Sequence, residues 1–238
     1  MVNFLTKKRA IIFDFDGTLA DTVGIWNEVD QLAIKKFCNK NVDLQIIQAD
    51  RENYLNHHNS GNVYENYVSF LKEKYHCQCD LDCLINQRRE IALDYIINKI
   101  DYKKDADKVL KRLKQLGYKL VLATTTARKT IDNYNLKNEN LIQKAKFDDI
   151  FDYIICNDDI TEKKPNPQIY YKSLAMLNLE PEDCLVVEDS LEGIIAAKKA
   201  GIQVLNIPDY YAKSNQKEID KLTDYQVKNF TEFLKLLN

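Results

Sequence analysis

The chain has 238 residues, of which 45% are hydrophobic and 29% are charged, so it is large enough to build one sizeable core or two smaller ones. Its 34 basic and 36 acidic residues leave a formal charge of −2 at pH 7. This balance gives no long-range attraction toward nucleic acid or an anionic membrane, and we expect neither as a partner. Selectivity for an anionic ligand must therefore come from local groups.

The sequence shows no membrane-spanning or signal-peptide pattern and no clear zinc-binding cysteine pattern. No apolar stretch approaches the roughly 18 residues needed to cross a bilayer, and residues 1–9 lack the apolar segment of a signal peptide. We therefore expect a cytoplasmic protein whose thiols are mostly reduced, and no disulfide is predicted. The cysteines near His76 lack the paired Cys-x-x-Cys spacing of a zinc site, which favours ordinary half-buried thiols over zinc. The six cysteines are Cys38, Cys77, Cys79, Cys83, Cys156 and Cys184.

The most informative motif follows the first predicted strand. Residues 10–13 form an apolar run typical of a buried parallel strand, and Asp14-Phe15-Asp16-Gly17-Thr18 comes directly after it. Parallel sheets place ligand chemistry beyond the carboxyl ends of their strands. Two carboxylates this close repel each other unless a cation, a shared proton or solvent relieves the field. The pattern favours a reactive site over a plain Asp/Gly turn.

The segment from about residue 22 to residue 100 shows apolar residues at helical spacing, and we expect a helical bundle there. Such stripes usually form a core rather than a cofactor site. The three stripes contain Ile25, Val29, Leu32 and Ala33; Tyr64, Tyr67, Val68 and Leu71; and Leu84, Ile85, Ile91, Ala92, Tyr95 and Ile96.

From Asp105 onward the pattern changes to alternating helices and strands, which predicts a parallel sheet. Gly117 and Gly201 are expected to close two of the helices in the left-handed conformation. We predict an α/β fold with a doubly wound core, interrupted after its first strand by the helical segment. The core domain comprises residues 1–21 and 101–238, and the inserted domain comprises residues 22–100. Strands are expected at 119–123, 153–156, 184–187 and 203–207, and helices near 109–116, 167–177 and 190–200.

Polar residues follow the later strands as well. The hydroxyls of Thr124, Thr125 and Thr126 can donate to anionic oxygens, although threonines after a strand are more often helix caps or turn residues. Lys164 precedes Pro165, which restricts the backbone before it and would aim the lysine side chain. Taken alone, this segment is typical of a solvated basic turn.

A second acidic pair, Glu188-Asp189, follows the apolar run at 185–187 and precedes Ser190 and a helix. Asp189 or Ser190 could simply cap that helix. Mg²⁺ prefers oxygen ligands, often one or two carboxylates together with substrate phosphate and water. Carboxylates from two strand ends would supply such a site, so the two acidic pairs explain each other.

Together these residues resemble the haloacid dehalogenase superfamily of phosphohydrolases, in the branch with a helical cap inserted after the first motif. The resemblance covers nearly the whole chain, and four motifs occur in the expected order. It implies a Rossmann-like core, an α-helical cap domain and Mg²⁺ as cofactor. The motifs are the segment from Asp14 to Thr22, Thr124 after a strand, Lys164 before Pro165, and Glu188-Asp189-Ser190.

The resemblance also implies roles for individual residues. Asp14 would be the nucleophile that forms an aspartyl phosphate, and Asp16 the general acid and base. Thr124, Thr125 and Lys164 would bind the phosphoryl group. The metal would be held by Asp14, by the backbone carbonyl of Asp16, by Asp189, and by Glu188 through water.

An aspartate at position 16 favours phosphoester chemistry, because a halide leaving group needs no proton. The main hypothesis is a magnesium-dependent hydrolase of a small phosphorylated metabolite, acting as a monomer or homodimer. A sugar phosphate mutase similar to β-phosphoglucomutase is one alternative, although such mutases carry a cap arginine beside a glycine, whereas Glu52 follows Arg51 here. The other is a non-catalytic binding module.

Specificity residues in the cap cannot be read from the pattern. Arg51, His57, His58 and Asn59 are the polar cap positions that we would examine first, although a surface loop also explains them. The two histidines are not expected to bind the metal, since Mg²⁺ prefers oxygen ligands.

Overall fold

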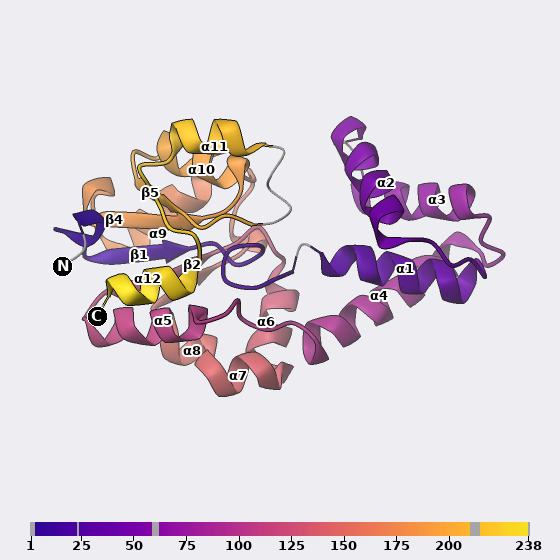
Figure 1. The fold of residues 1–238 in the computed structure, drawn as a ribbon, viewed down its shortest axis with the longest axis horizontal. Coiled ribbons are helices and arrows are strands. Elements are labelled where there is room, and N and C mark those ends of the chain that lie inside the picture. The colour runs from indigo at the N-terminus through magenta and orange to yellow at the C-terminus, as the bar shows by residue number, and fades with distance from the viewer. Residues whose placement is uncertain (1–2, 23, 59–61, 210–214, 238) are drawn as a thin grey trace. The chain divides into compact units, whose positions relative to one another are not determined.

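The computed structural model describes residues 3–22, 24–58, 62–209 and 215–237, and the chain forms two compact units (Figure 1). The core unit combines Met1–Asp21 with Ile100–Asn238, and the helical unit is Thr22–Lys99. The chain therefore leaves the core unit shortly after its first strand and returns to it before the second.

A six-stranded parallel sheet forms the centre of the core unit, in the order β3-β2-β1-β4-β5-β6. Phe13, the last residue of β1, lies opposite Leu122 and Val187. Residues that follow these three strands are consequently brought to one edge of the sheet, as the α/β prediction requires. The strands are β1 (Ala10–Phe13), β2 (Lys119–Ala123), β3 (Tyr153–Ile155), β4 (Cys184–Glu188), β5 (Gln203–Asn206) and β6 (Tyr225–Gln226).

Helices cover both faces of this sheet, with α10 and α11 on one face and α5 and α12 on the other (Figure 1). Both layers exclude water from the strands, and every residue of β1 and β4 is buried. The helices of this unit are α5 (Ala106–Gln115), α6 (Arg128–Lys137), α7 (Glu139–Ala145), α8 (Phe147–Ile150), α9 (Gln168–Leu177), α10 (Leu191–Lys199), α11 (Gln216–Leu222) and α12 (Phe230–Leu236), with 3-10 turns at Asn3–Leu5, Asn157–Asp159 and Pro181–Asp183.

Two glycines end helices as predicted, with φ of 86° at Gly117 and 77° at Gly201. The helices between β2 and β3, the short strand β6 and the two C-terminal helices were not predicted individually. Phe4 packs against Phe233 of α12 with ring centroids 5.6 Å apart, so the two ends of the core unit's chain lie side by side.

The helical unit contains α1 (Ile25–Phe37), α2 (Leu44–His57), α3 (Val63–Tyr75) and α4 (Leu81–Asn98). Side chains of Asp43, Asn62 and Asp80 accept hydrogen bonds from backbone amides in the first turns of α2, α3 and α4, which fixes where those helices begin. The predicted stripes of α3 and α4 supply much of its core. Leu32 is wrong as a core residue, since it is 39% exposed and Ile34 is buried instead.

A disulfide joins Cys38 to Cys77 within the helical unit, so the prediction that no disulfide forms is wrong for this pair. That prediction rested on compartment alone. Packing of the helices brings the C-terminal ends of α1 and α3 together, and both cysteines are buried there. Because Cys77 is in the disulfide, it cannot serve as a thiolate ligand beside His76. The free cysteines are Cys79, Cys83, Cys156 and Cys184.

Among the helices of the described segments, none is both long and apolar enough to cross a membrane.

Candidate active site

A tight turn follows β1 and presents the first motif. The amide of Asp14 extends the sheet by donating to the carbonyl of Val187, and the amides of Leu19 and Ala20 both donate to the carbonyl of Phe15. Gly17 has φ of 81°, in the left-handed region that favours glycine. A side chain there would also collide with the carboxylate of Asp189, so glycine is required on two counts.

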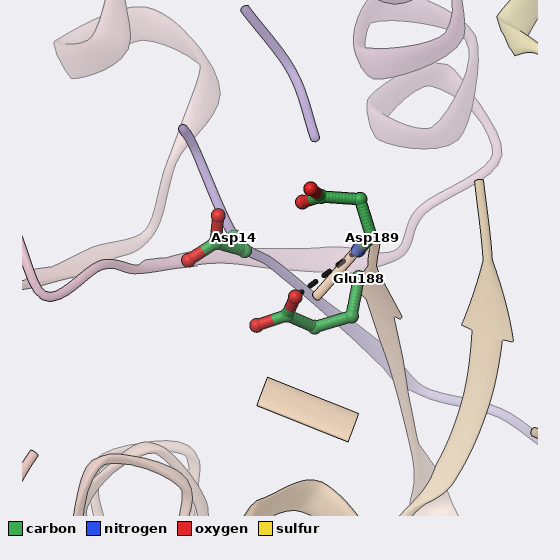
Figure 2. A group of neighbouring side chains, drawn as sticks. All are labelled: Asp14, Glu188 and Asp189. Carbon is green, nitrogen blue, oxygen red and sulfur yellow. Dashed lines mark hydrogen bonds between the residues drawn. The ribbon is translucent and has the colours of Figure 1, made fainter. Parts of the chain in front are cut away.

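Three carboxylates converge at the carboxyl ends of β1 and β4. Asp14, Glu188 and Asp189 each place one oxygen within 4.8 Å of the others, and all three side chains are buried. Figure 2 shows their carboxylate groups on the same side of the chain that carries Glu188 and Asp189. The predicted convergence of residues remote in sequence is therefore present in the fold.

Lys164 lies among these acids. Its Nζ is 2.6 Å from Asp14 Oδ1, 2.6 Å from Glu188 Oε1 and 3.1 Å from the carbonyl oxygen of Ala123. Burial acts to lower the pKa of Lys164, but Asp14 and Glu188 outweigh it and hold that pKa well above the usual value. Lys164 therefore remains a cation inside the site.

Glu188 uses both of its carboxylate oxygens within the chain. Oε1 accepts from Lys164 and, at 3.1 Å, from the hydroxyl of Tyr170. Oε2 accepts from the amides of Asp189 and Ser190 and from the Ser190 hydroxyl, at 3.0 to 3.1 Å. A Cβ at Gly193 would collide with the Glu188 carboxylate, so α10 needs glycine here. These contacts suit Glu188 to position Lys164 and the turn after β4.

Asp189 is held by Thr18, whose hydroxyl donates to Asp189 Oδ1 at 2.5 Å. Thr18 is fully buried, so this hydrogen bond ties the turn after β1 to the turn after β4. Burial, together with repulsion from Glu188 and Asp14, raises the pKa of Asp189 well above its ordinary range, while Thr18 and Lys103 oppose the shift.

Asp14 experiences the same environment. Burial raises its pKa to about 8, with Glu188 and Asp16 adding to the shift and Lys164 opposing it. Three carboxylates and one ammonium sum to −2 when all are ionised. A buried excess of negative charge is costly unless a cation compensates it.

Asp16 points to a different group of residues. Its Oδ2 accepts a hydrogen bond from the hydroxyl of Thr126 at 2.5 Å and a longer one from Thr124 at 3.4 Å. The side chain of Asp16 therefore lies outside the group of three clustered acids, although its charge acts on Asp14, and the expectation that its backbone carbonyl helps to hold a metal stays a prediction. Thr125 is half-buried, and its predicted phosphate contact also remains a prediction.

Some residues of this edge were missed. Lys103 donates to the carbonyl of Gly17 and lies 2.6 Å from Asp209 Oδ2, which joins the turn after β1 to the segment after β5. Asn206, at the end of β5, donates to the carbonyl of Glu188 at 3.0 Å. Polar residues at the end of the last long strand are a signal that would have found Asn206 and Asp209. Lys103 carries no comparable signal.

The predicted specificity residues belong to the helical unit. Arg51 Nη1 lies 3.2 Å from Asp30 Oδ2, and Asp30 also accepts from Arg88 at 2.6 Å and from the Tyr67 hydroxyl at 2.8 Å. Arg51 is therefore already paired with an acid of its own unit.

Both histidines contact the backbone one turn earlier in α2. Nδ1 of His57 is 2.7 Å from the carbonyl oxygen of Asn53, and Nδ1 of His58 is 3.0 Å from that of Tyr54. Asn59 lies outside the described residues. Specificity roles for these residues remain predictions.

Comparison with known proteins identifies the family. The sequence profile of haloacid dehalogenase-like hydrolases matches residues 11–207, which begins within β1 and ends just after β5. The chain belongs to this family. It is accordingly a hydrolase of the haloacid dehalogenase type, as the resemblance of its motifs predicted.

Curated relatives support this membership. Protein CbbY of Cereibacter sphaeroides is 31% identical over 217 residues, which cover 87% of each chain. Pyrophosphatase PpaX of Bacillus cereus is 27% identical over 193 residues, covering 81% of this chain and 80% of PpaX. A bifunctional riboflavin kinase/FMN phosphatase of Arabidopsis thaliana is 26% identical over 212 residues, covering 87% of this chain. The match spans only 51% of that plant protein, about half its length.

Solved structures of this family share the fold. A candidate β-phosphoglucomutase from Thermotoga maritima superposes with a TM-score of 0.77 at 23% identity, covering 96% of this chain and 98% of that chain. A CbbY variant from Rhodobacter sphaeroides in complex with xylulose bisphosphate gives a TM-score of 0.71 at 23% identity, covering 97% and 99%. These similarities confirm the predicted fold class.

Proposed function

We propose that this protein is a magnesium-dependent phosphomonoester hydrolase that acts on a small phosphorylated metabolite through an aspartyl phosphate. The observation that carries the proposal is the cluster of Asp14, Glu188 and Asp189 around Lys164 at the carboxyl edge of the sheet. Relatives named as phosphatases support the same reaction class.

The donor set fits a divalent cation. Three buried carboxylates face one direct cationic partner, and burial raises the pKa of Asp14 and Asp189, as expected where compensating charge is lacking. Asp14 and Asp189 would hold Mg²⁺ directly, with the carbonyl of Asp16, and Glu188 would act through water. Bound there, Mg²⁺ would neutralise charge on the phosphoryl group.

Asp14 would begin the reaction. Its carboxylate oxygen attacks phosphorus, the bond from phosphorus to the ester oxygen breaks, and Asp16 gives its proton to the leaving alkoxide. Asp16, now a carboxylate, then takes a proton from water as that water attacks the phosphorus of the aspartyl phosphate. The bond from Asp14 to phosphorus breaks and inorganic phosphate leaves, so both residues return to their starting states.

Other residues would position these groups. Thr126 and Thr124 hold the Asp16 carboxylate by hydrogen bonds from their hydroxyls, which fixes its direction before proton transfer. Lys164 donates a hydrogen bond to Asp14 and would also donate to the oxygens of the transferred phosphoryl group. Its positive charge would stabilise the negative charge on those oxygens, which is the main source of catalysis in this reaction class. With substrate bound, Thr124 would turn its hydroxyl from Asp16 to the same phosphoryl oxygens, and Thr125 would contribute a second hydroxyl.

Phosphate release from an aryl phosphate such as p-nitrophenyl phosphate tests the proposal. We expect turnover with Mg²⁺, and we expect Asp14→Asn to reduce it by at least about 10³-fold, because the amide cannot serve as the nucleophile. Asp132→Asn, an exposed aspartate on α6, is the matched control and should retain turnover. Unchanged turnover in Asp14→Asn would overturn the assignment.

Product analysis separates hydrolysis from the mutase alternative, which uses the same aspartyl phosphate. β-Glucose 1-phosphate should give free phosphate if the protein is a hydrolase, and an isomerised sugar phosphate if it is a mutase. A panel of sugar phosphates, phosphoglycolate and nucleoside monophosphates would then define the substrate. Metal binding without turnover on the whole panel would favour the non-catalytic binding module.

A further inference from the structure

A cavity opens in the core unit at the amino ends of β1 and β2. It has a volume of about 600 Å³, within the range typical of small-molecule sites. Because the strands are parallel, this basal pocket lies at the edge of the sheet opposite the clustered acids. Its lining residues are Leu5, Lys7, Lys8, Arg9, Leu116, Gly117, Tyr118, Lys119, Leu177 and Leu179.

The polar part of the basal pocket is strongly cationic. Lys7, Lys8, Arg9 and Lys119 line it, and none of its described lining residues is acidic. Arg9 has an ion pair with Asp183, but the Arg9 side chain is 65% exposed. Pairs this exposed contribute little and can be exchanged for another anion at small cost.

The other cations are also weakly compensated. Lys119 contacts Asp152 at 3.0 Å, yet its side chain is 63% exposed and it shares that acid with Lys114. Lys8 Nζ donates to the carbonyl oxygen of Glu182 at 2.6 Å, a neutral partner. Burial lowers the pKa of Lys8, although Cys184 and nearby acids act to raise it. The Lys8 ammonium has no direct ion pair with those acids, namely Asp224, Glu182 and Asp183, so it can donate to a bound anion.

The rest of the lining is apolar. Leu5, Leu177 and Leu179 are buried or half-buried, and the ring of Tyr118 lies beside them. Leu116 is 46% exposed and adds apolar surface to the lining. An apolar surface beside a cationic one is complementary to an amphipathic anion. An inorganic anion would leave the leucines exposed to water, and a neutral lipid would give the lysines no anionic partner.

We propose that the basal pocket binds a small organic anion with an apolar body, such as a medium-chain carboxylate. The carboxylate would contact Lys7 and Lys8, and the chain would cover Leu116, Leu177 and Leu179. The four residues of β1 separate the two edges by roughly 13 Å at about 3.3 Å per residue. The ligand would therefore bind without displacing a phosphorylated substrate.

Decanoate below its micelle concentration is the probe, measured by calorimetric titration of the full chain. We expect one decanoate per chain, and at least a tenfold weaker affinity in Lys7→Gln/Lys8→Met. The matched control is Lys217→Gln/Lys221→Gln, which removes two exposed charges from α11 and should leave the affinity unchanged. Decyltrimethylammonium, of similar chain length and opposite charge, should not bind.

The Asp14→Asn variant distinguishes failure of this proposal from failure of the proposed function. It alters only the clustered acids, so it should bind decanoate with the affinity of the wild type. Equal decanoate affinity in Lys7→Gln/Lys8→Met and in wild type would overturn the proposal. So would equal binding of decyltrimethylammonium, or loss of decanoate binding when inorganic phosphate and Mg²⁺ are added first.

Discussion

Two buried charge clusters, one in each unit, differ in how their charges are balanced. In the helical unit, Asp30 is fully buried and accepts from Arg51, Arg88 and Tyr67, so its carboxylate is satisfied by its own chain. In the core unit, the three buried carboxylates have one direct cationic partner within the described residues, Lys164, which contacts Asp14 and Glu188 but not Asp189. With every group ionised, the first cluster has a surplus of one positive charge and the second a surplus of two negative charges.

The surroundings of each cluster match this difference. The guanidinium of Arg88 lies 5.3 Å from the ring centre of Trp26 and 5.1 Å from that of Tyr64. These cation–π contacts stabilise the extra positive charge of the Asp30 cluster. In the core unit, Lys164 lowers the pKa of Asp14 and Lys103 lowers that of Asp189, but burial and the neighbouring acids still raise both pKa values above the ordinary range. A buried cluster satisfied by its own chain stabilises a fold, whereas one left short of countercharge is suited to bind a ligand.

The largest expected effect is on the helical unit. Asp30→Asn should lower its free energy of unfolding by about 3 kcal/mol or more, because it leaves the guanidinium of Arg88, only 2% exposed, without its carboxylate. Trp26 is the single tryptophan of the chain and lies in this cluster, so urea unfolding followed by its fluorescence reports on the helical unit.

Glu90→Gln, an exposed acid on α4, serves as the control and should change the unfolding free energy by less than about 0.5 kcal/mol. Equal unfolding curves for Asp30→Asn and Glu90→Gln would show that the Asp30 cluster is not structural, and the contrast with the core unit would fail.

The opposite sign is expected for Asp189→Asn in the core unit. The amide keeps an oxygen for the Thr18 hydroxyl while removing one of three repelling charges. Without Mg²⁺ at pH 7.5, the free energy of unfolding should rise, because the amide lacks the charge that Glu188 and Asp14 repel. Thermal unfolding followed by circular dichroism measures this, and a lower melting temperature would contradict it.

The pH dependence follows from the same shift. Asp14 has a folded pKa of about 8, above the ordinary value of 3.8, so its neutral form is the one that the fold favours. Its contribution to stability is complete below the unfolded pKa and is lost as the pH rises toward 8. The metal-free wild type should therefore lose stability between pH 5 and pH 8, and a stability that rises across this window would count against the account.

The smallest effects concern thiols. Without reductant, denatured protein should react with a thiol reagent at four cysteines, since Cys38 and Cys77 form a disulfide. In the native state at pH 8 we expect Cys79 and Cys83 to react first. Burial raises the pKa of Cys156 and of Cys184 to about 12, so these two should stay protected. Six reactive thiols in unreduced, denatured protein would exclude the disulfide.

Much of the fold could be predicted because its signals are local. The apolar runs of β1, β2 and β4 are uniform enough to identify buried parallel strands, and Gly117 and Gly201 mark helix ends by their backbone freedom. The segment 128–150 carries no equally clear periodicity, so its helices depend on contacts that the sequence does not show. Leu32 illustrates the same limit, since its exposure depends on how α1 is rotated against its neighbours.

The candidate site shows a similar division. Strand ends placed Asp14, Lys164, Glu188 and Asp189 at one edge, and the fold brings them together. The direction of each side chain was not readable: Asp16, two residues after Asp14, turns to Thr126 instead of to the other acids. Lys103 reaches the site only through its contacts with Gly17 and Asp209, which are tertiary and leave no local pattern.

The most direct test of the central claim is the affinity of the protein for Mg²⁺ alone. Calorimetric titration should find one ion per wild-type chain and at least tenfold weaker binding in both Asp14→Asn and Asp189→Asn, while Asp132→Asn binds as the wild type does. If all four proteins bind Mg²⁺ equally, the clustered carboxylates do not form a metal site and the account is contradicted.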